Sequence, residues 1–88
     1  MKKIIKFYTS TCGPCKIQTE WLKKLENVEI QNVDIEDDDS MELMIKYKVR
    51  NVPTLVLLDD TDEVLRVFHG LTEIDEINKV IEYHVNKE

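Results

Sequence analysis

The hydrophobic pattern of the first third of the chain predicts a strand, a helix and a second strand. Residues 3–8 are mostly β-branched or aromatic and run into polar residues, as a strand that enters a loop does. Residues 13 to about 25 begin with a proline in the first helical turn, where a missing N–H costs nothing. Their apolar residues recur at helical spacing, namely Ile17, Trp21, Leu22 and Leu25. Residues 28–35 then alternate as a second strand.

The middle of the chain predicts a second helix. Residues 37–40 are three aspartates and a serine, which supply acids and a capping residue for a helix through residues 41–47. This acidic run fits a solvated helix start better than a calcium loop, because the glycine and the distant glutamate of such a loop are missing. Trp21 and Tyr47 fall at core-facing helical positions, and we interpret both as packing residues.

The last third of the chain predicts a hairpin and a final helix. Residues 54–58 form an apolar run typical of a strand buried on both faces, and the acidic turn that follows leads to a strand at 64–68. Thr72, with Asp75 three positions on, is the expected cap of an amphipathic helix. The helix is marked by Ile74, Ile77, Val80, Ile81 and Val85.

The element order is therefore βαβαββα, which belongs to the α/β class. A βαβ unit requires a parallel strand pair with a right-handed crossover, and the hairpin adds antiparallel strands. We expect a four-stranded mixed sheet flanked by three helices, with helices on both faces. At 88 residues the chain is long enough for one domain, which we expect to span 1–88.

Composition and charge exclude several classes of partner and location. Eighteen acidic against twelve basic residues give a formal charge of −6, which argues against binding to nucleic acid or to anionic lipid. The N-terminal apolar run is broken by Lys6 and is too short for a signal sequence, and no run reaches the length of a membrane span. We therefore expect a cytoplasmic protein, in a compartment where structural disulfides rarely persist.

Cys12 and Cys15, the only cysteines, lie two residues apart at the start of the first predicted helix. A disulfide between them could close, but so small a ring removes little entropy from the unfolded chain, so a structural staple explains the pair poorly. A closed zinc site needs four ligands, and neither a second cysteine pair nor paired histidines are present. We therefore expect no metal.

A reactive dithiol explains more of the local sequence. Cys12 would lie at a helix N-terminus, where unpaired N–H groups and the helix dipole stabilise a thiolate. Cys15, one turn further in, would attack the mixed disulfide formed at Cys12 and leave a Cys12–Cys15 disulfide. Lys16 either adds a little positive potential or is a solvated lysine on the exposed helix face.

Two motifs at this spacing make the chain similar to the thioredoxin superfamily. They are Cys12-Gly13-Pro14-Cys15-Lys16, between a strand and a helix, and Asn51-Val52-Pro53-Thr54, before a later strand. The resemblance covers nearly the whole chain. Thioredoxins carry a further N-terminal strand and helix, so the compact layout is closer to that of glutaredoxins, whereas the active-site tetrapeptide is that of thioredoxin.

The resemblance implies a thiol-disulfide oxidoreductase that reduces disulfides in partner proteins. It implies that the Val52–Pro53 bond is cis, that the backbone of Val52 meets an extended substrate segment, and that Gly70 lies beside the same groove. A trans proline that starts a strand and a simple turn glycine are the alternatives. The resemblance also implies a monomer that needs no bound cofactor and takes electrons from a donor of the thioredoxin-reductase kind.

Two positions depart from the family pattern. Thr11 stands where thioredoxins usually have a tryptophan, which leaves a smaller and more polar rim around the dithiol. Lys6 stands where the family usually has a buried acid, thought to help proton transfer at the second cysteine. Lys6 shares a strand face with Ile4 and Tyr8, so either its stem is buried while its amine reaches solvent, or the amine itself is inside. Because Asp34 falls on the neighbouring strand where thioredoxins often have a lysine, our hypothesis is a Lys6–Asp34 pair beneath Cys15.

Three other functions stay open at this point. One is a glutathione-dependent, glutaredoxin-like activity, although an aromatic residue between the cysteines and a glycine pair after the last strand are missing; only His69 and Gly70 stand there. Another is a redoxin specific for ribonucleotide reductase. The last is a thioredoxin-like binding module whose cysteines are incidental, which would tolerate serine at both positions.

Overall fold

The computed structural model describes the backbone of residues 1–87 and the side chains of residues 1–85. One four-stranded sheet and three α-helices make up the regular structure of this part. In chain order the elements are β1 (Lys2–Tyr8), α1 (Gly13–Leu22), β2 (Val28–Asp34), the short 3-10 helix η1 (Asp38–Ser40), α2 (Met41–Lys46), β3 (Thr54–Leu58), β4 (Val64–His69) and α3 (Ile74–Lys87). Within residues 1–87, none of the helices has the length and apolar character needed to cross a bilayer.

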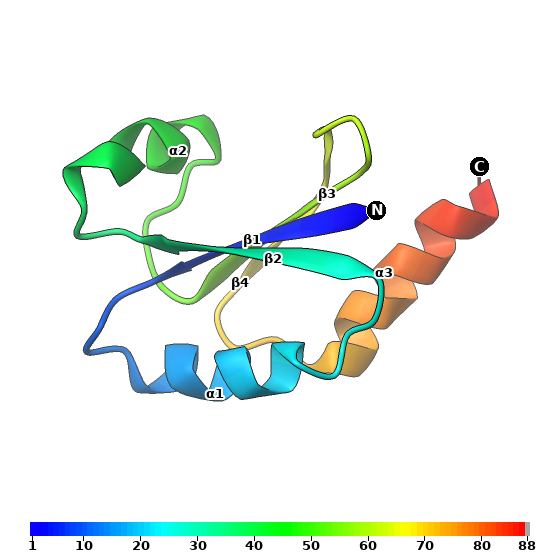
Figure 1. Ribbon diagram of the computed structural model, residues 1–88, viewed down its shortest axis with the longest axis horizontal. Coiled ribbons are helices and arrows are strands. Elements are labelled where there is room, and N and C mark those ends of the chain that lie inside the picture. Colours follow the sequence, from blue (N-terminus) through cyan, green and yellow to red (C-terminus); the bar gives the residue numbers. More distant parts are fainter. Residues whose placement is uncertain (88) are drawn as a thin grey trace.

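The sheet has the strand order β2-β1-β3-β4. The β1–β2 pair is parallel, as the connection through α1 requires, while β3 runs antiparallel to both β1 and β4. Helix α2 covers one face of the sheet, and α1 and α3 cover the other (Figure 1). The predicted βαβαββα fold is therefore confirmed.

The core consists of two apolar clusters, one on each face of the sheet. Strand β3 contributes to both and is buried at every position, because helices cover both of its faces. The buried residues on the side of α1 and α3 are Ile4, Leu22, Leu55, Leu57, Phe68 and Ile77. Those on the side of α2 are Ile5, Phe7, Val33, Val49, Val56 and Leu58.

Helix α1 differs from its prediction in length and in the face that it buries. It ends at Leu22 rather than near Leu25. Ile17 is 46% exposed, whereas Gln18 is fully buried. Trp21 is half-buried. Gln18 is buried because its side chain pairs with backbone groups of the segment before α3, which is a tertiary contact that helical periodicity does not contain.

The expected caps of the other two helices are also wrong. Helix α3 begins at Ile74, and the Thr72 hydroxyl donates to the Gly70 carbonyl instead of capping the helix. At the start of α2, the Ser40 hydroxyl donates to the Asp37 carbonyl at 2.6 Å and makes no capping bond. The acidic run forms the extra turn η1, and the Ser40 hydroxyl bonds back to the residue before this turn instead of capping α2.

Candidate active site

The two cysteines lie at the N-terminus of α1 and form a disulfide in this structure. Cys12 precedes the helix in an extended conformation, and the Cys15 N–H donates to the Cys12 sulfur at 3.1 Å. Cys12 is half-buried, whereas Cys15 is only 2% exposed. Cys12 is therefore the more accessible cysteine of the pair, and Cys15 is buried.

The surroundings of Cys12 favour a thiolate. Its sulfur takes the place of an N-cap oxygen, so it accepts a hydrogen bond from one of the otherwise unpaired N–H groups of the helix start. The positive end of the helix dipole acts on the same atom, and the first turn of α1 contains no acidic residue to oppose it. The rim of the site is exposed and consists of Thr11, Gly13, Pro14 and Lys16.

Strand register brings the second motif to the same end of the sheet. Thr54 pairs with Phe7 on one side and with His69 on the other, so Pro53 and Gly70 lie beside the end of β1 from which the Cys12 loop departs. Figure 1 shows the segment before β3 and the start of α1 at this end. The Val52–Pro53 peptide bond is cis, as the resemblance implied.

Local hydrogen bonds hold this second loop in place. The Gly70 N–H donates to the Pro53 carbonyl at 2.9 Å, and the Thr54 hydroxyl donates to the Asn51 carbonyl at 2.7 Å. Gly70 has φ = +79°, a conformation that glycine adopts at little cost. A Cβ at Gly70 would meet no atom within 4 Å, so the backbone there borders open space.

Comparison with known proteins agrees with this geometry. The thioredoxin family model matches residues 1–83. The chain belongs to the thioredoxin family. It is 39% identical over 85 residues to a thioredoxin of Chlamydia trachomatis, a match that covers 92% of this chain and 80% of that protein. The solved structure of a mutant thioredoxin from Halobacterium salinarum is 30% identical with a TM-score of 0.77, over 93% of this chain and 73% of that one.

Membership of the thioredoxin family, together with the Cys12–Cys15 pair, makes the chain a thiol-disulfide oxidoreductase. Its substrates are protein disulfides, and its electrons come from a reductase-type donor. The comparisons give no support to a glutathione-dependent enzyme, to a redoxin specific for one reductase or to a non-catalytic module. Among the described residues, no cluster of three or more histidines, cysteines or acids could hold a metal ion.

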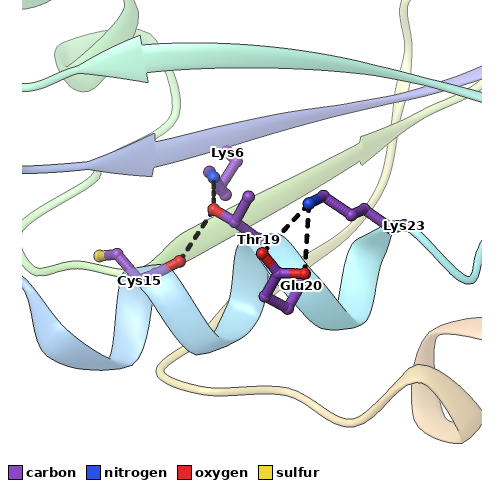
Figure 2. Close-up of polar contacts among 5 residues, drawn as sticks. All are labelled: Lys6, Cys15, Thr19, Glu20 and Lys23. Atoms are coloured by element: carbon purple, nitrogen blue, oxygen red, sulfur yellow. Dashed lines mark hydrogen bonds and ion pairs between the residues drawn. The ribbon is translucent and has the colours of Figure 1, made fainter.

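This thioredoxin-family chain has a lysine beneath its second cysteine. Lys6 is only 4% exposed, and its amine donates to the Thr19 hydroxyl. Thr19 in turn donates to the Cys15 carbonyl at 3.0 Å (Figure 2). Burial removes water from around the amine and disfavours its charged form, which lowers the pKa of Lys6 below its ordinary value. A cavity of about 280 Å³ adjoins these contacts, and Lys6, Cys15 and Thr19 line it together.

The expected Lys6–Asp34 pair is wrong. Lys6 lies opposite Asn32 in the β1–β2 register, and Asp34 lies opposite Tyr8, further along the strand. The Asp34 carboxylate accepts a hydrogen bond from the Glu36 N–H and serves the turn after β2. Of the two positions considered for the amine, the structure shows the buried one, because Lys6 is 4% exposed and its amine is directed at α1 (Figure 2).

Thr19 is the site residue that sequence reasoning missed. A signal for it exists, because Thr19 lies one helical turn after Cys15 and so shares its face of α1. A hydroxyl at that spacing can donate to the carbonyl four residues earlier and still accept a second hydrogen bond. The sequence does not tell which strand residue supplies that second donor.

Proposed function

We propose that Cys12 is the nucleophile and Cys15 the resolving thiol in the reduction of partner-protein disulfides. The Cys12 thiolate attacks one sulfur of the substrate disulfide, which forms a mixed disulfide and releases the other sulfur as a thiolate. Cys15 then attacks the Cys12 sulfur, so that the substrate leaves with both thiols and the Cys12–Cys15 disulfide remains. The carrying observation is the unequal exposure of the two cysteines, because the half-buried Cys12 is more open to a protein substrate than the buried Cys15.

The groove beside Cys12 is proposed to hold an extended segment of the substrate. The backbone of Val52, next to the buried Pro53, would pair with that segment, and Gly70 would allow its close approach. The rim residues Thr11, Gly13, Pro14 and Lys16 would contact the substrate side chains that flank the disulfide. The polar rim at Thr11 favours substrates that do not need an aromatic contact there.

The proposed role also suggests an oligomeric state, a cellular location and an electron donor. We propose a monomer whose residues 1–88 form one domain and which works in the cytoplasm, where reductases keep dithiols reduced. No bound cofactor is needed, because the dithiol carries the two electrons itself. A donor of the thioredoxin-reductase kind would return the disulfide to the dithiol after each turnover, which an assay with such a reductase and its nicotinamide cofactor can follow.

The experiment that tests the cysteine roles is reduction of insulin by dithiothreitol, catalysed by the native protein, by Cys12→Ser and by Cys15→Ser. Both variants should lose the catalytic rate. Cys15→Ser should accumulate a mixed disulfide through Cys12, because the resolving thiol is missing, and Cys12→Ser should not. Thr61→Ser, at the exposed turn between β3 and β4, is the control for a hydroxyl change remote from the site.

Three kinds of result would contradict the proposal. A mixed disulfide trapped through Cys15 would reverse the two roles. Native-level catalysis by both serine variants would favour a binding module. The same conclusion would follow if the native protein showed no catalysis and its partner still bound when both cysteines were serine. A rate that requires glutathione rather than the reductase would instead indicate the glutaredoxin-like alternative.

A further inference from the structure

Lys6 lies in a position that is unfavourable for a cation unless an anion lies nearby. Its side chain extends from β1, an inner strand of the sheet, toward α1 and is almost fully enclosed. Its described hydrogen-bond partner is the neutral Thr19 hydroxyl. A buried charge that lacks a charged partner is costly, so the retention of a lysine here calls for an explanation.

The elements packed around Lys6 supply few ionisable groups. On β1, the Tyr8 ring centroid lies 5.4 Å from the Lys6 amine, while β2 places the neutral Asn32 and β3 the apolar Leu55 opposite Lys6. Among residues 1–85, no carboxylate forms an ion pair with Lys6; those that pair with a cation are Glu20, Glu29 and Asp60.

Helix α1 and its C-cap residue supply the remaining ionisable groups. Lys16 and Lys23 line the two cavities that border Lys6, and both side chains are exposed. Glu20 is held by Lys23 at 3.1 Å and is itself 68% exposed, so it is screened by solvent. Cys15 lines the same cavity as Lys6 and becomes titratable once the disulfide is reduced. Among the described residues around Lys6, Cys15 is therefore the buried group that can carry a negative charge once it is reduced.

We propose that Lys6 is a positioning residue of the resolving step: it holds the first turn of α1 through Thr19 and supplies the positive charge that stabilises the Cys15 thiolate. The inference rests on the resolving role of Cys15 proposed above. In the mixed disulfide, the Cys15 thiol gives its proton to water and the thiolate attacks the Cys12 sulfur. The Cys12–Cys15 bond forms, the bond from Cys12 to the substrate breaks, and the substrate thiolate takes a proton from water.

The direct test is the titration of Cys15 in the Cys12→Ser background, where it is the single thiol. The ultraviolet absorbance of the thiolate is recorded against pH, and the double variant Cys12→Ser/Cys15→Ser provides the baseline for tyrosine. Added Lys6→Met or Lys6→Gln removes the charge, and each should raise the measured pKa of Cys15 by about one unit. Lys23→Met, which removes an exposed lysine directly after α1, should leave the pKa of Cys15 unchanged.

The kinetic test follows the resolving step itself, by rapid-mixing measurement of substrate-thiol release from the mixed disulfide. A rise of about one pKa unit cuts the thiolate fraction about tenfold below that pKa, while the more basic thiolate is about threefold more nucleophilic, so release should slow about threefold. The pH at which release reaches its plateau should rise by the same unit. A purely structural defect would lower the plateau without moving this pH.

A measured pKa of Cys15 that stays at its native value in either Lys6 variant would overturn the proposal. Melting curves show whether each variant is folded, and if Lys6→Met does not fold, Lys6→Gln decides, because it keeps a donor for Thr19. The insulin assay with Cys12→Ser and Cys15→Ser is independent of Lys6. Failure of the cysteine roles is therefore distinguishable from failure of the role proposed for Lys6.

Discussion

At the scale of single residues, the buried amine of Lys6 links stability to pH. Because burial disfavours its charged form, the folded protein holds the Lys6 proton less tightly than the unfolded chain does. Between the lowered pKa of the folded state and the ordinary value of 10.5, the unfolded chain binds more protons. Within that window this residue makes the fold more stable as pH rises, and below it the full penalty of the buried charge applies.

We expect Lys6→Met to stabilise the oxidised protein near neutral pH by about 1 kcal/mol, because an apolar chain of similar length replaces a buried cation. The gain should shrink as pH rises toward 10.5. Urea unfolding of both proteins at a series of pH values measures the difference. The oxidised form is used so that no Cys15 thiolate can offset the charge. A gain that is constant over pH would contradict the lowered pKa.

The face that Lys6 occupies was predictable from sequence, but its partner was not. Alternation along residues 3–8 places Lys6 with Ile4 and Tyr8 on one side of the strand, and the structure agrees. The partner depends on the register between β1 and β2, and a two-residue shift separates Asn32 from Asp34. Register is set by the packing of the whole sheet, which two strand sequences do not specify.

At the scale of elements, Gln18 fastens α1 to the segment before α3. Its side-chain N–H donates to the Thr72 carbonyl at 2.9 Å, and its side-chain oxygen accepts from the Thr72 N–H at 2.8 Å. Both ends of the amide are therefore used, and the side chain is fully enclosed. The contact fixes the helix that carries the dithiol against the segment that follows Gly70.

Gln18→Leu should destabilise the protein by about 2 to 3 kcal/mol, although it makes the core more apolar, because the buried N–H and carbonyl of Thr72 lose their partners. Chemical denaturation of the variant and of the native protein gives the value. Gln31→Leu, the same change at a half-buried position on the edge strand β2, should cost less than about 0.5 kcal/mol. Equal losses of unfolding free energy at the two positions would show that the two hydrogen bonds of Gln18 do not stabilise the fold.

Helical periodicity could not identify this contact. Ile17 and Trp21 form one stripe along α1, and Gln18 and Leu22 form the next stripe, one residue around the helix. Hydrophobicity favours the first stripe, whereas the structure buries the second because Thr72 offers two backbone partners. By contrast, the apolar run of β3 needed no partner information, since a strand buried on both faces is apolar at every position.

At the scale of the whole molecule, the sheet topology brings together the parts of the site that lie far apart in the sequence. The antiparallel pairing of β3 with β1 and β4 brings three loops, those of Cys12, Pro53 and Gly70, to one end of the sheet. The order of strands and helices in the sequence predicted the parallel β1–β2 crossover and the antiparallel hairpin. That the three loops meet was expected from the resemblance to the thioredoxin superfamily, because element order does not specify which loops lie together.

The same architecture predicts that reduction leaves the fold intact. The two apolar clusters lie on either face of the sheet, and only Leu22, of the buried residues of these clusters, belongs to the helix that begins at the dithiol. The disulfide closes a ring with a sequence separation of three, so its loss should lower the free energy of unfolding by only about 2 kcal/mol.

Urea unfolding with and without dithiothreitol measures this difference, and the double variant Cys12→Ser/Cys15→Ser separates its causes. If the fold stabilises the Cys15 thiolate, Cys12→Ser should gain stability relative to Cys12→Ser/Cys15→Ser as pH rises, because Cys12 is absent from both, and adding Lys6→Met to both should reduce this gain. Cooperative unfolding of the reduced protein is the expected result, since the two-layer core does not depend on the ring. A reduced protein that lacks a cooperative transition would mean that the dithiol loop holds the sheet together.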